Sequence, residues 1–173
     1  NAADAEVRAA AARAGCRVSF YAVDGEDTGD VTPEWLIAPA PVHNGVLPFD
    51  LFLGGSACGR FYSPLFGSYN RKYAVAALAL CALATGADLQ QLGRALTQFG
   101  GVKRRQELRG IAHGVRVYDD FAHHPTAVLE TLSGFRARHP EGQLIAVFEP
   151  RSATASRKIH QAAYATAFAP ADL

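Results

Sequence analysis

The sequence predicts a mixed α/β protein in which two kinds of organisation follow one another along the chain. Ala-rich and amphipathic stretches typical of helices alternate with short apolar runs typical of strands. Before Gly100-Gly101, Gly-containing turn signals separate these runs, which favours antiparallel hairpins. After this pair the order becomes strand, helix, strand, which favours a parallel sheet. We therefore expect two parts, residues 1–100 and residues 101–173.

Composition excludes several classes of protein. The chain has 173 residues, of which 49% are hydrophobic and 19% are charged, so disorder is excluded as its main state. The formal net charge of +1 argues against a nucleic-acid-binding domain, which normally has a basic excess. The longest apolar run, Tyr73 to Ala84, is about twelve residues and too short to span a bilayer. We expect neither a nucleic-acid partner nor a membrane.

Cysteine and methionine usage adds two expectations. The three cysteines, Cys16, Cys58 and Cys81, are far apart and form no CxxC pair, so we expect small buried hydrophobic residues in a reducing cytoplasm. The chain contains no methionine and begins with Asn1, and it therefore reads as an internal piece of a longer protein.

The first part is predicted to contain a helix and a set of short strands. Asp4 is a suitable N-cap for a helix over residues 4–14. Three apolar or alternating segments follow between residues 35 and 65, separated by Asn44-Gly45 and Gly54-Gly55, which are typical of hairpin turns.

Two further helices complete this part. Gly67 to Asn70 is expected to be a break before an Ala-rich helix over residues 72–84, whose apolar residues run all round and predict full burial. Asp88 is expected to cap a helix over residues 89–99.

The second part is predicted to begin with a hairpin and to continue as a strand–helix–strand unit. The expected elements are strands over 107–111 and 115–120, a helix over 125–138 that starts at a proline, a strand over 144–148 and a helix over 159–168.

Polar residues follow both strands that flank the 125–138 helix. A right-handed crossover would make these strands parallel, and ligands bind at the carboxyl edge of such sheets. The polar residues at this edge are Asp119, Asp120, His123 and His124 after the first strand, and Glu149, Arg151, Ser152 and Thr154 after the second. Arg157 and Lys158 add cations, and the N-terminus of the 125–138 helix favours an anion. This pattern predicts an anionic ligand, with an aspartate for a ribose hydroxyl or a bound cation.

Other interpretations of these residues stay open. Asp and His at a strand-to-helix turn can simply cap the helix. The DDxxHH run could hold Zn²⁺ or Mn²⁺ in a metal-dependent phosphoesterase. Residues 103–105, Lys-Arg-Arg, could be a solvated linker or a phosphate-binding group. The sequence contains no GxxxxGK[ST], GxGxxG or GxSxG motif.

Four segments together resemble the Mur ligases, the ATP-dependent amide-forming enzymes of peptidoglycan metabolism. They are GSYN at 67–70, GVKRRQE at 101–107, YDDFAHHPT at 118–126 and EPRSAT at 149–154. The third and fourth are most similar to the branch that joins UDP-N-acetylmuramate to the recycled tripeptide L-alanyl-γ-D-glutamyl-meso-diaminopimelate, the murein peptide ligases. The branch that adds L-alanine, which usually has a QPHR-like sequence at the fourth segment, is the alternative. A non-catalytic binding module is a further one.

The resemblance implies a domain assignment. Residues 1–100 would be the tail of the central ATPase domain, built of helices and small antiparallel strands. Residues 101–173 would be the first part of a Rossmann-like C-terminal domain. The phosphate loop and most ligands of Mg²⁺ would lie outside this chain, so the chain alone is expected to be inactive.

The resemblance also implies roles for individual residues. In the family, ATP phosphorylates a carboxylate, and an amine attacks the acyl phosphate. The implied ATP-binding residues are Asn70, Arg105, Asp120, His123 and His124, and the implied substrate-binding residues are Arg151, Ser152, Thr154 and Lys158. No metal ligand is implied within the chain. Tyr69 and Tyr73 stand where the family usually has His and Asn.

Overall fold

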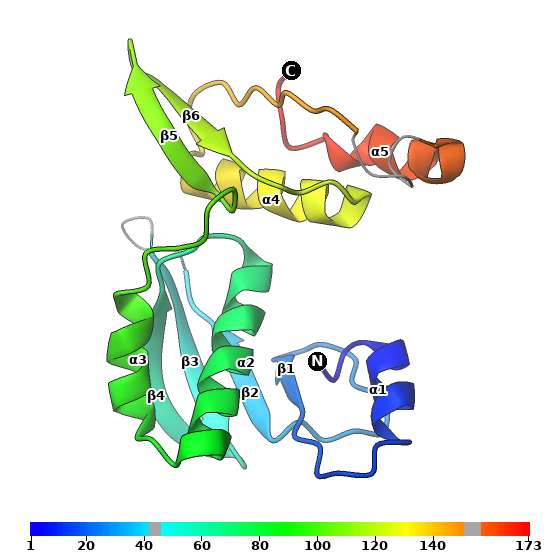
Figure 1. Cartoon of the computed structure of the whole chain (residues 1–173), viewed down its shortest axis with the longest axis vertical. Helices are drawn as coiled ribbons and strands as arrows, with labels where there is room; N and C mark the ends of the chain where they lie inside the picture. The colour runs from blue at the N-terminus through cyan, green and yellow to red at the C-terminus, as the bar shows by residue number, and fades with distance from the viewer. Residues whose placement is uncertain (42–45, 151–156) are drawn as a thin grey trace. The chain divides into compact units, whose positions relative to one another are not determined.

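The chain forms two compact units in a computed structural model that describes residues 1–41, 46–150 and 157–173 (Figure 1). Unit 1 comprises Asn1–Pro64 and Tyr69–Phe99, and unit 2 comprises Leu65–Ser68 and Gly100–Leu173. The mixture of helices and sheets confirms the predicted α/β class. Among the helices of these described ranges, none is long and apolar enough to cross a membrane.

Unit 1 is built on a four-stranded sheet. Its strands, β1 (Tyr21–Val23), β2 (Trp35–Pro39), β3 (Leu47–Leu53) and β4 (Ser56–Ser63), lie in the order β1-β2-β3-β4. β1 is parallel to β2, and the other neighbours are antiparallel. Gly54 and Gly55 have φ of +56° and +81° and make the β3–β4 turn, which confirms the predicted hairpin. The predicted turn at Asn44-Gly45 lies outside the described residues.

The helices of this half of the chain begin as their caps predict, with one exception. The Asp4 carboxylate accepts hydrogen bonds from two backbone N–H groups at the start of α1 (Ala5–Ala11), and Asp88 caps α3 (Leu89–Thr97). α1 ends at Ala11, before the predicted end at residue 14. The long helix α2 (Ser68–Thr85) begins earlier than predicted, so Asn70 lies in its first turn and not in a break.

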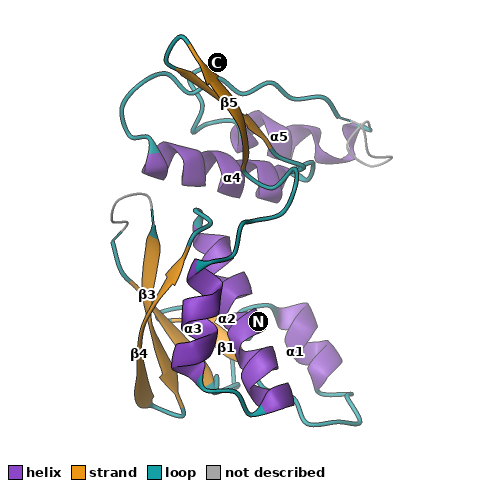
Figure 2. Cartoon of the chain, turned by 60° about the vertical axis from the view of Figure 1, so that its left-hand side comes forward, coloured by secondary structure: helices purple, strands orange, loops and turns teal. Residues whose placement is uncertain are grey.

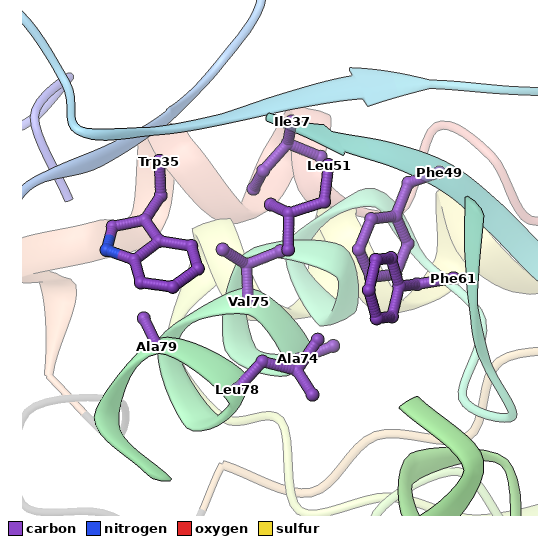
Figure 3. Packing of buried hydrophobic residues seen from close by; sticks show 9 residues of the cluster. All are labelled: Trp35, Ile37, Phe49, Leu51, Phe61, Ala74, Val75, Leu78 and Ala79. Atoms are coloured by element: carbon purple, nitrogen blue, oxygen red, sulfur yellow. The ribbon is translucent and has the colours of Figure 1, made fainter. Parts of the chain in front are cut away.

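The core of unit 1 lies between one face of the sheet and α2 (Figure 3). The sheet contributes large side chains, and α2 contributes mostly small ones, so the helix packs close to the strands. The core residues are Trp35, Ile37, Phe49, Leu51 and Phe61 from the sheet, and Ala74, Val75, Leu78 and Ala79 from α2. Leucines of α3 pack against the same cluster, so both helices cover one face, and Figure 2 shows them beside the sheet.

Two expectations about burial are wrong. The sheet covers only one face of α2, so the opposite face leaves Leu80 and Leu83 69% and 50% exposed. Cys81 lies on this exposed part of α2 and is also exposed. Cys16 is exposed in the loop after α1, and Cys58 is half-buried, so the cysteines are not the buried residues that we expected. Within the described residues, the face of α2 that packs is the one toward the sheet.

Gly93 is where α3 approaches the core most closely. A Cβ at this position would lie 2.7 Å from Cδ1 of Phe61, whose ring is buried. We expect Gly93→Ala to lower the free energy of unfolding by about 1–2 kcal/mol, because overpacking exceeds the gain in helix propensity. Urea unfolding followed by the fluorescence of the single tryptophan, Trp35, measures this. Gly15→Ala is the control, since its Cβ would meet nothing within 4 Å; equal stabilities of the two variants would contradict the prediction.

Unit 2 begins with the predicted hairpin and continues with helices. β5 (Glu107–Ala112) pairs antiparallel with β6 (Val115–Asp119) through a turn in which His113 and Gly114 have φ of +50° and +82°. α4 (Pro125–Arg138) starts at its proline as predicted. The 3₁₀ helix η1 (Lys158–His160) leads into α5 (Gln161–Ala167).

The predicted strand over residues 144–148 is wrong. β6 pairs only with β5 in the described sheet, so the expected parallel strand pair is not formed there. Residues 144–148 are extended but bond only to residues 172–173, where Ala146 N donates to Leu173 O at 2.8 Å and Asp172 N donates to Leu144 O at 2.8 Å. A strand requires a continuous ladder, and two hydrogen bonds do not make one.

α4 is buried on the face that the sequence predicted. Its Val128 and Leu132 pack with Ala167 of α5, and the half-buried side chains of Ala146 and Phe148 cover them. The extended segment therefore belongs to the core of unit 2 without being part of its sheet.

A short segment that precedes α2 also belongs to unit 2. The Phe66 ring lies 4.7 Å from that of Phe135 and 6.2 Å from that of Tyr118, centroid to centroid. The buried Gln106 side chain donates from Nε2 to Phe66 O at 2.7 Å. These contacts explain why Leu65–Ser68 groups with unit 2.

Candidate functional site

The basic run Lys103-Arg104-Arg105 forms a tight turn with an unusual backbone. Arg104 and Gln106 have φ of +59° and +51°, in the left-handed region that residues other than glycine seldom adopt. Arg104 N donates to the Glu107 carboxylate at 2.8 Å, and Arg105 N donates to Val102 O at 3.1 Å. Such conformations persist only where surrounding contacts hold them, and they gather at functional sites. We call residues 103–106 the basic turn.

The Asp120 side chain links the basic turn to the loop after β6 through hydrogen bonds. Its Oδ2 accepts a hydrogen bond from Gln106 N at 2.8 Å, and its Oδ1 accepts one from Ala122 N at 2.7 Å. Phe121 N donates to Arg104 O at 2.8 Å. Both carboxylate oxygens therefore accept a hydrogen bond from a backbone N–H group, and each retains a lone pair for a further donor.

Three side chains, those of Arg104, Arg105 and His123, lie against the exposed ring of Phe121. Cζ of Arg104 lies 5.1 Å from the ring centroid and Cζ of Arg105 lies 5.6 Å from it. The His123 ring packs edge-on against the same ring at 5.1 Å between centroids, and its Nδ1 is 2.9 Å from Phe121 O. We call Arg104, Arg105, Phe121 and His123 the Phe121 cluster.

The two arginines of this cluster differ in their ion pairs. Nε of Arg104 lies 3.6 Å from a carboxylate oxygen of Asp119. Within the part of the chain that the structure describes, Arg105 forms no ion pair within 4.0 Å. Arg105 is thus an exposed cation that is held against an aromatic ring and remains available to an anion.

Glu107 helps to hold the basic turn and should titrate accordingly. The hydrogen bond from Arg104 N lowers the pKa of the Glu107 carboxyl, with a smaller contribution from the Arg109 side chain. A depressed pKa in the folded state means that this contact stabilises the fold above the unfolded-state pKa and is lost as pH falls through the folded-state pKa. An NMR titration of the Glu107 carboxyl carbon is expected to give a pKa below that of a free glutamate. A normal or raised pKa would show that the contact does not persist in solution.

The two predicted histidines have different surroundings. His123 belongs to the Phe121 cluster, and its carbonyl oxygen accepts a short hydrogen bond from the Tyr164 hydroxyl. His124 is the N-cap residue of α4, makes no capping bond with its side chain, and packs against His160 at 4.9 Å between ring centroids. The structure therefore joins Arg105, Asp120 and His123, while the His124 ring faces His160.

The other predicted site residues are dispersed or not described. Asn70 is in unit 1, 6% exposed, and next to Tyr69, whose ring lies 5.7 Å from that of Tyr73. Lys158 is exposed at the start of η1. The predicted residues Arg151, Ser152 and Thr154 lie outside the described residues.

The metal interpretation of the DDxxHH run finds no support in the geometry. Among residues 1–41, 46–150 and 157–173, no three His, Cys, Asp or Glu side chains are placed to hold an ion. Asp120 bonds to backbone N–H groups, and His123 and His124 pack against different rings.

Sequence reasoning missed Phe121 and Gln106. In the sequence, Phe121 is an apolar residue beside two aspartates and gives no sign of a role at a site. Only the structure shows that its ring is 47% exposed. Gln106 offers no signal in the sequence, because its role depends on a carbonyl 40 residues away.

Comparison with known proteins finds a similarity in the C-terminal part of the chain. Residues 104–172 match the family model described as Mur ligase, glutamate ligase domain. This part of the chain is therefore similar to the C-terminal domain of Mur ligases. The match begins at Arg104 and includes the whole Phe121 cluster.

Curated relatives extend the similarity to much of the remaining chain. A UDP-N-acetylmuramate–L-alanine ligase from Rubrobacter xylanophilus is 40% identical over 123 residues, which are 70% of this chain and 27% of the relative. The enzyme of the same name from Roseiflexus sp. is 31% identical over 146 residues, 81% of this chain and 31% of the relative. The chain thus spans about 30% of the length of these curated relatives.

Solved structures of Mur ligases have the same fold. A murein peptide ligase from Psychrobacter arcticus is 30% identical, with a TM-score of 0.56 over 89% of this chain and 31% of that protein. A UDP-N-acetylmuramate-alanine ligase from Thermotoga maritima gives a TM-score of 0.70 over 84% of this chain at 22% identity.

Proposed function

We propose that this chain is part of an ATP-dependent ligase that forms an amide bond on the carboxylate of UDP-N-acetylmuramate, in the cytoplasm and in peptidoglycan recycling. The observation that carries the proposal is the Phe121 cluster with Asp120, inside the segment that matches the Mur ligase family. Residues 1–100 would then be the end of the central ATPase domain and residues 101–173 the start of the C-terminal domain.

The cluster has the chemistry that a nucleotide requires. An exposed guanidinium without an ion pair suits a phosphate, and a carboxylate with lone pairs to spare suits a ribose hydroxyl. We assign Arg105 to the phosphates, Asp120 to the ribose, Asn70 to the adenine, and His123 and His124 to the surroundings of the nucleotide. Acyl-phosphate chemistry depends mainly on such positioning and on stabilisation of the transferred charge.

Among the described residues, no three His, Cys, Asp or Glu side chains are grouped so that they alone could hold the Mg²⁺ ion that accompanies ATP. The resemblance to the Mur ligases implies ligands of Mg²⁺ mainly outside residues 1–173, and we assign no step of the reaction to the ion here.

The proposed amine is the alanine end of the tripeptide L-alanyl-γ-D-glutamyl-meso-diaminopimelate. The EPRS sequence at 149–152 and the 30% identity to a murein peptide ligase over 89% of the chain support it. Arg151, Ser152, Thr154 and Lys158 would face this substrate. The L-alanine relatives, at up to 41% identity, favour L-alanine as the second candidate.

The full-length protein encoded by the gene that contains this chain provides the test. It is supplied with UDP-N-acetylmuramate, ATP and either the tripeptide or L-alanine, and both ADP and the amide product are measured. A higher kcat/KM for the tripeptide supports the proposal, and a higher value for L-alanine supports the second candidate. Absence of both products would reject the ligase. The 173-residue chain alone is expected to give no ATP turnover.

A further inference from the structure

We propose that Phe121 is a positioning residue that holds Arg104, Arg105 and His123 together as one binding surface for a polyphosphate. The inference rests on the proposed function for the identity of the ligand, the triphosphate of ATP. The role of Phe121 itself rests on contacts within unit 2.

The position of Phe121 is fixed by its own backbone. Its N–H donates to Arg104 O at 2.8 Å, and Asp120 and Ala122 on either side are linked by the 2.7 Å hydrogen bond from Ala122 N to Asp120 Oδ1. The ring is therefore held at the edge of the basic turn while remaining 47% exposed.

The ring restrains side chains that would otherwise be mobile. Cations over an aromatic face at 5.1 and 5.6 Å lie within the range of cation–π attraction. Arginine loses much rotamer freedom when it binds an anion, and a ring that already restrains the guanidinium lowers this entropic loss. Phe121 therefore favours anion binding without touching the anion.

The charges around the ring favour a ligand with several negative charges. Asp119 pairs with Arg104 and Glu107 pairs with Arg109, whereas Arg105 has no ion pair among the described residues. Lys103 adds a further cation at the same turn. A triphosphate offers enough oxygens to bind two guanidinium groups and an ammonium group at once.

The test compares Phe121→Leu with Phe121→Tyr in the full-length protein. Leucine removes the π face, whereas tyrosine keeps it. We expect Phe121→Leu to reduce kcat/KM for ATP about tenfold, mainly through KM, and Phe121→Tyr to behave like the wild type. Arg109→Met is the control, since it removes a nearby cation that is paired with Glu107 and not with the ring. Equal losses for the leucine and tyrosine variants would overturn the inference.

A double-mutant cycle distinguishes positioning from a general structural effect. If Phe121 acts through Arg105, Phe121→Leu causes little further loss of kcat/KM for ATP in an Arg105→Met background. The losses caused by the two substitutions are then not additive. Fully additive losses would overturn the inference. This cycle remains informative if Phe121→Leu also lowers stability, because loss of stability adds independently.

Two further measurements extend the test. The first shows which substrate carries the phosphates that bind the cluster, and the second does not depend on ligase activity. A KM increase confined to UDP-N-acetylmuramate would support the cluster as a phosphate site and assign it to that diphosphate. Calorimetric binding of inorganic tripolyphosphate needs no turnover. Weaker binding by Phe121→Leu supports the inference even if no ligase activity is found, and unchanged binding together with unchanged KM values overturns it.

Discussion

Replacing Phe49 with alanine is expected to lower the free energy of unfolding of unit 1 by about 3–5 kcal/mol, the typical cost of removing a buried phenylalanine side chain. Phe49 is fully buried at the centre of β3. It pairs in register with Phe61 on β4, and their rings stack at 5.9 Å between centroids. Figure 3 shows both rings in the layer between the sheet and α2. The cavity would therefore open where these two elements meet.

The measurement uses the only tryptophan of the chain, Trp35, which is buried in the same core. Its fluorescence in urea reports the unfolding of unit 1. Tyr62→Ala is the control, because Tyr62 lies next to Phe61 on β4 but is 43% exposed, and its loss should cost about 1 kcal/mol or less. A loss for Phe49→Ala no larger than that of the control would show that this layer is not the core in solution.

Local chemistry predicted the turns and the caps of this fold well. Gly54-Gly55, His113-Gly114, Asp4, Asp88 and Pro125 all have the roles expected of them, because each depends on backbone geometry within a few residues. The buried face of α4 was also predicted, since Val128, Leu132 and Phe135 follow the period of the helix.

Features that depend on distant partners could not be predicted in this way. Residues 144–148 have the composition of a buried strand, but their ladder depends on neighbours that local sequence does not specify. The exposed face of α2 has the same origin, because composition gives its hydrophobicity and the sheet decides which face is covered.

The candidate site was predicted by residue but not by arrangement. The sequence singled out Asp120 and His123 because polar residues gather at the predicted edge of the sheet, and Arg105 because it lies in the basic run after Gly100-Gly101. The resemblance to the Mur ligases implied the ATP-binding role of all three. It did not show that Arg104 and Gln106 adopt left-handed backbone conformations or that Phe121 lies among the cations. These features come from hydrogen bonds between residues about 14 positions apart.

Changing Asp120 to asparagine is expected to have the second large effect. Asparagine has nearly the same shape but offers only one acceptor oxygen, so one of the two backbone N–H groups would face an amide NH₂ donor. Hydrogen bonds to a charged acceptor contribute about 1.5–3 kcal/mol, and we expect a loss of that order in the free energy of unfolding of unit 2 without any nucleotide. Amide hydrogen exchange at Gln106 and Ala122 should accelerate. Asp119→Asn is the matched control, because its carboxylate makes an exposed ion pair at 3.6 Å worth about 1 kcal/mol or less.

The same variant separates two roles of the Asp120 carboxylate in the full-length protein. If Asp120 only bound a ribose hydroxyl, Asp120→Asn would have no effect on activity with whichever of 2′-deoxy-ATP and 3′-deoxy-ATP lacks that hydroxyl. Because the carboxylate also holds the left-handed turn that carries Arg105, we expect kcat/KM to fall more than about tenfold with both deoxy-nucleotides as well as with ATP. Unchanged activity with one deoxy-nucleotide, together with unchanged stability, would assign Asp120 to the ribose alone. A parallel loss with all three nucleotides would show that the aspartate acts on Arg105 through the backbone.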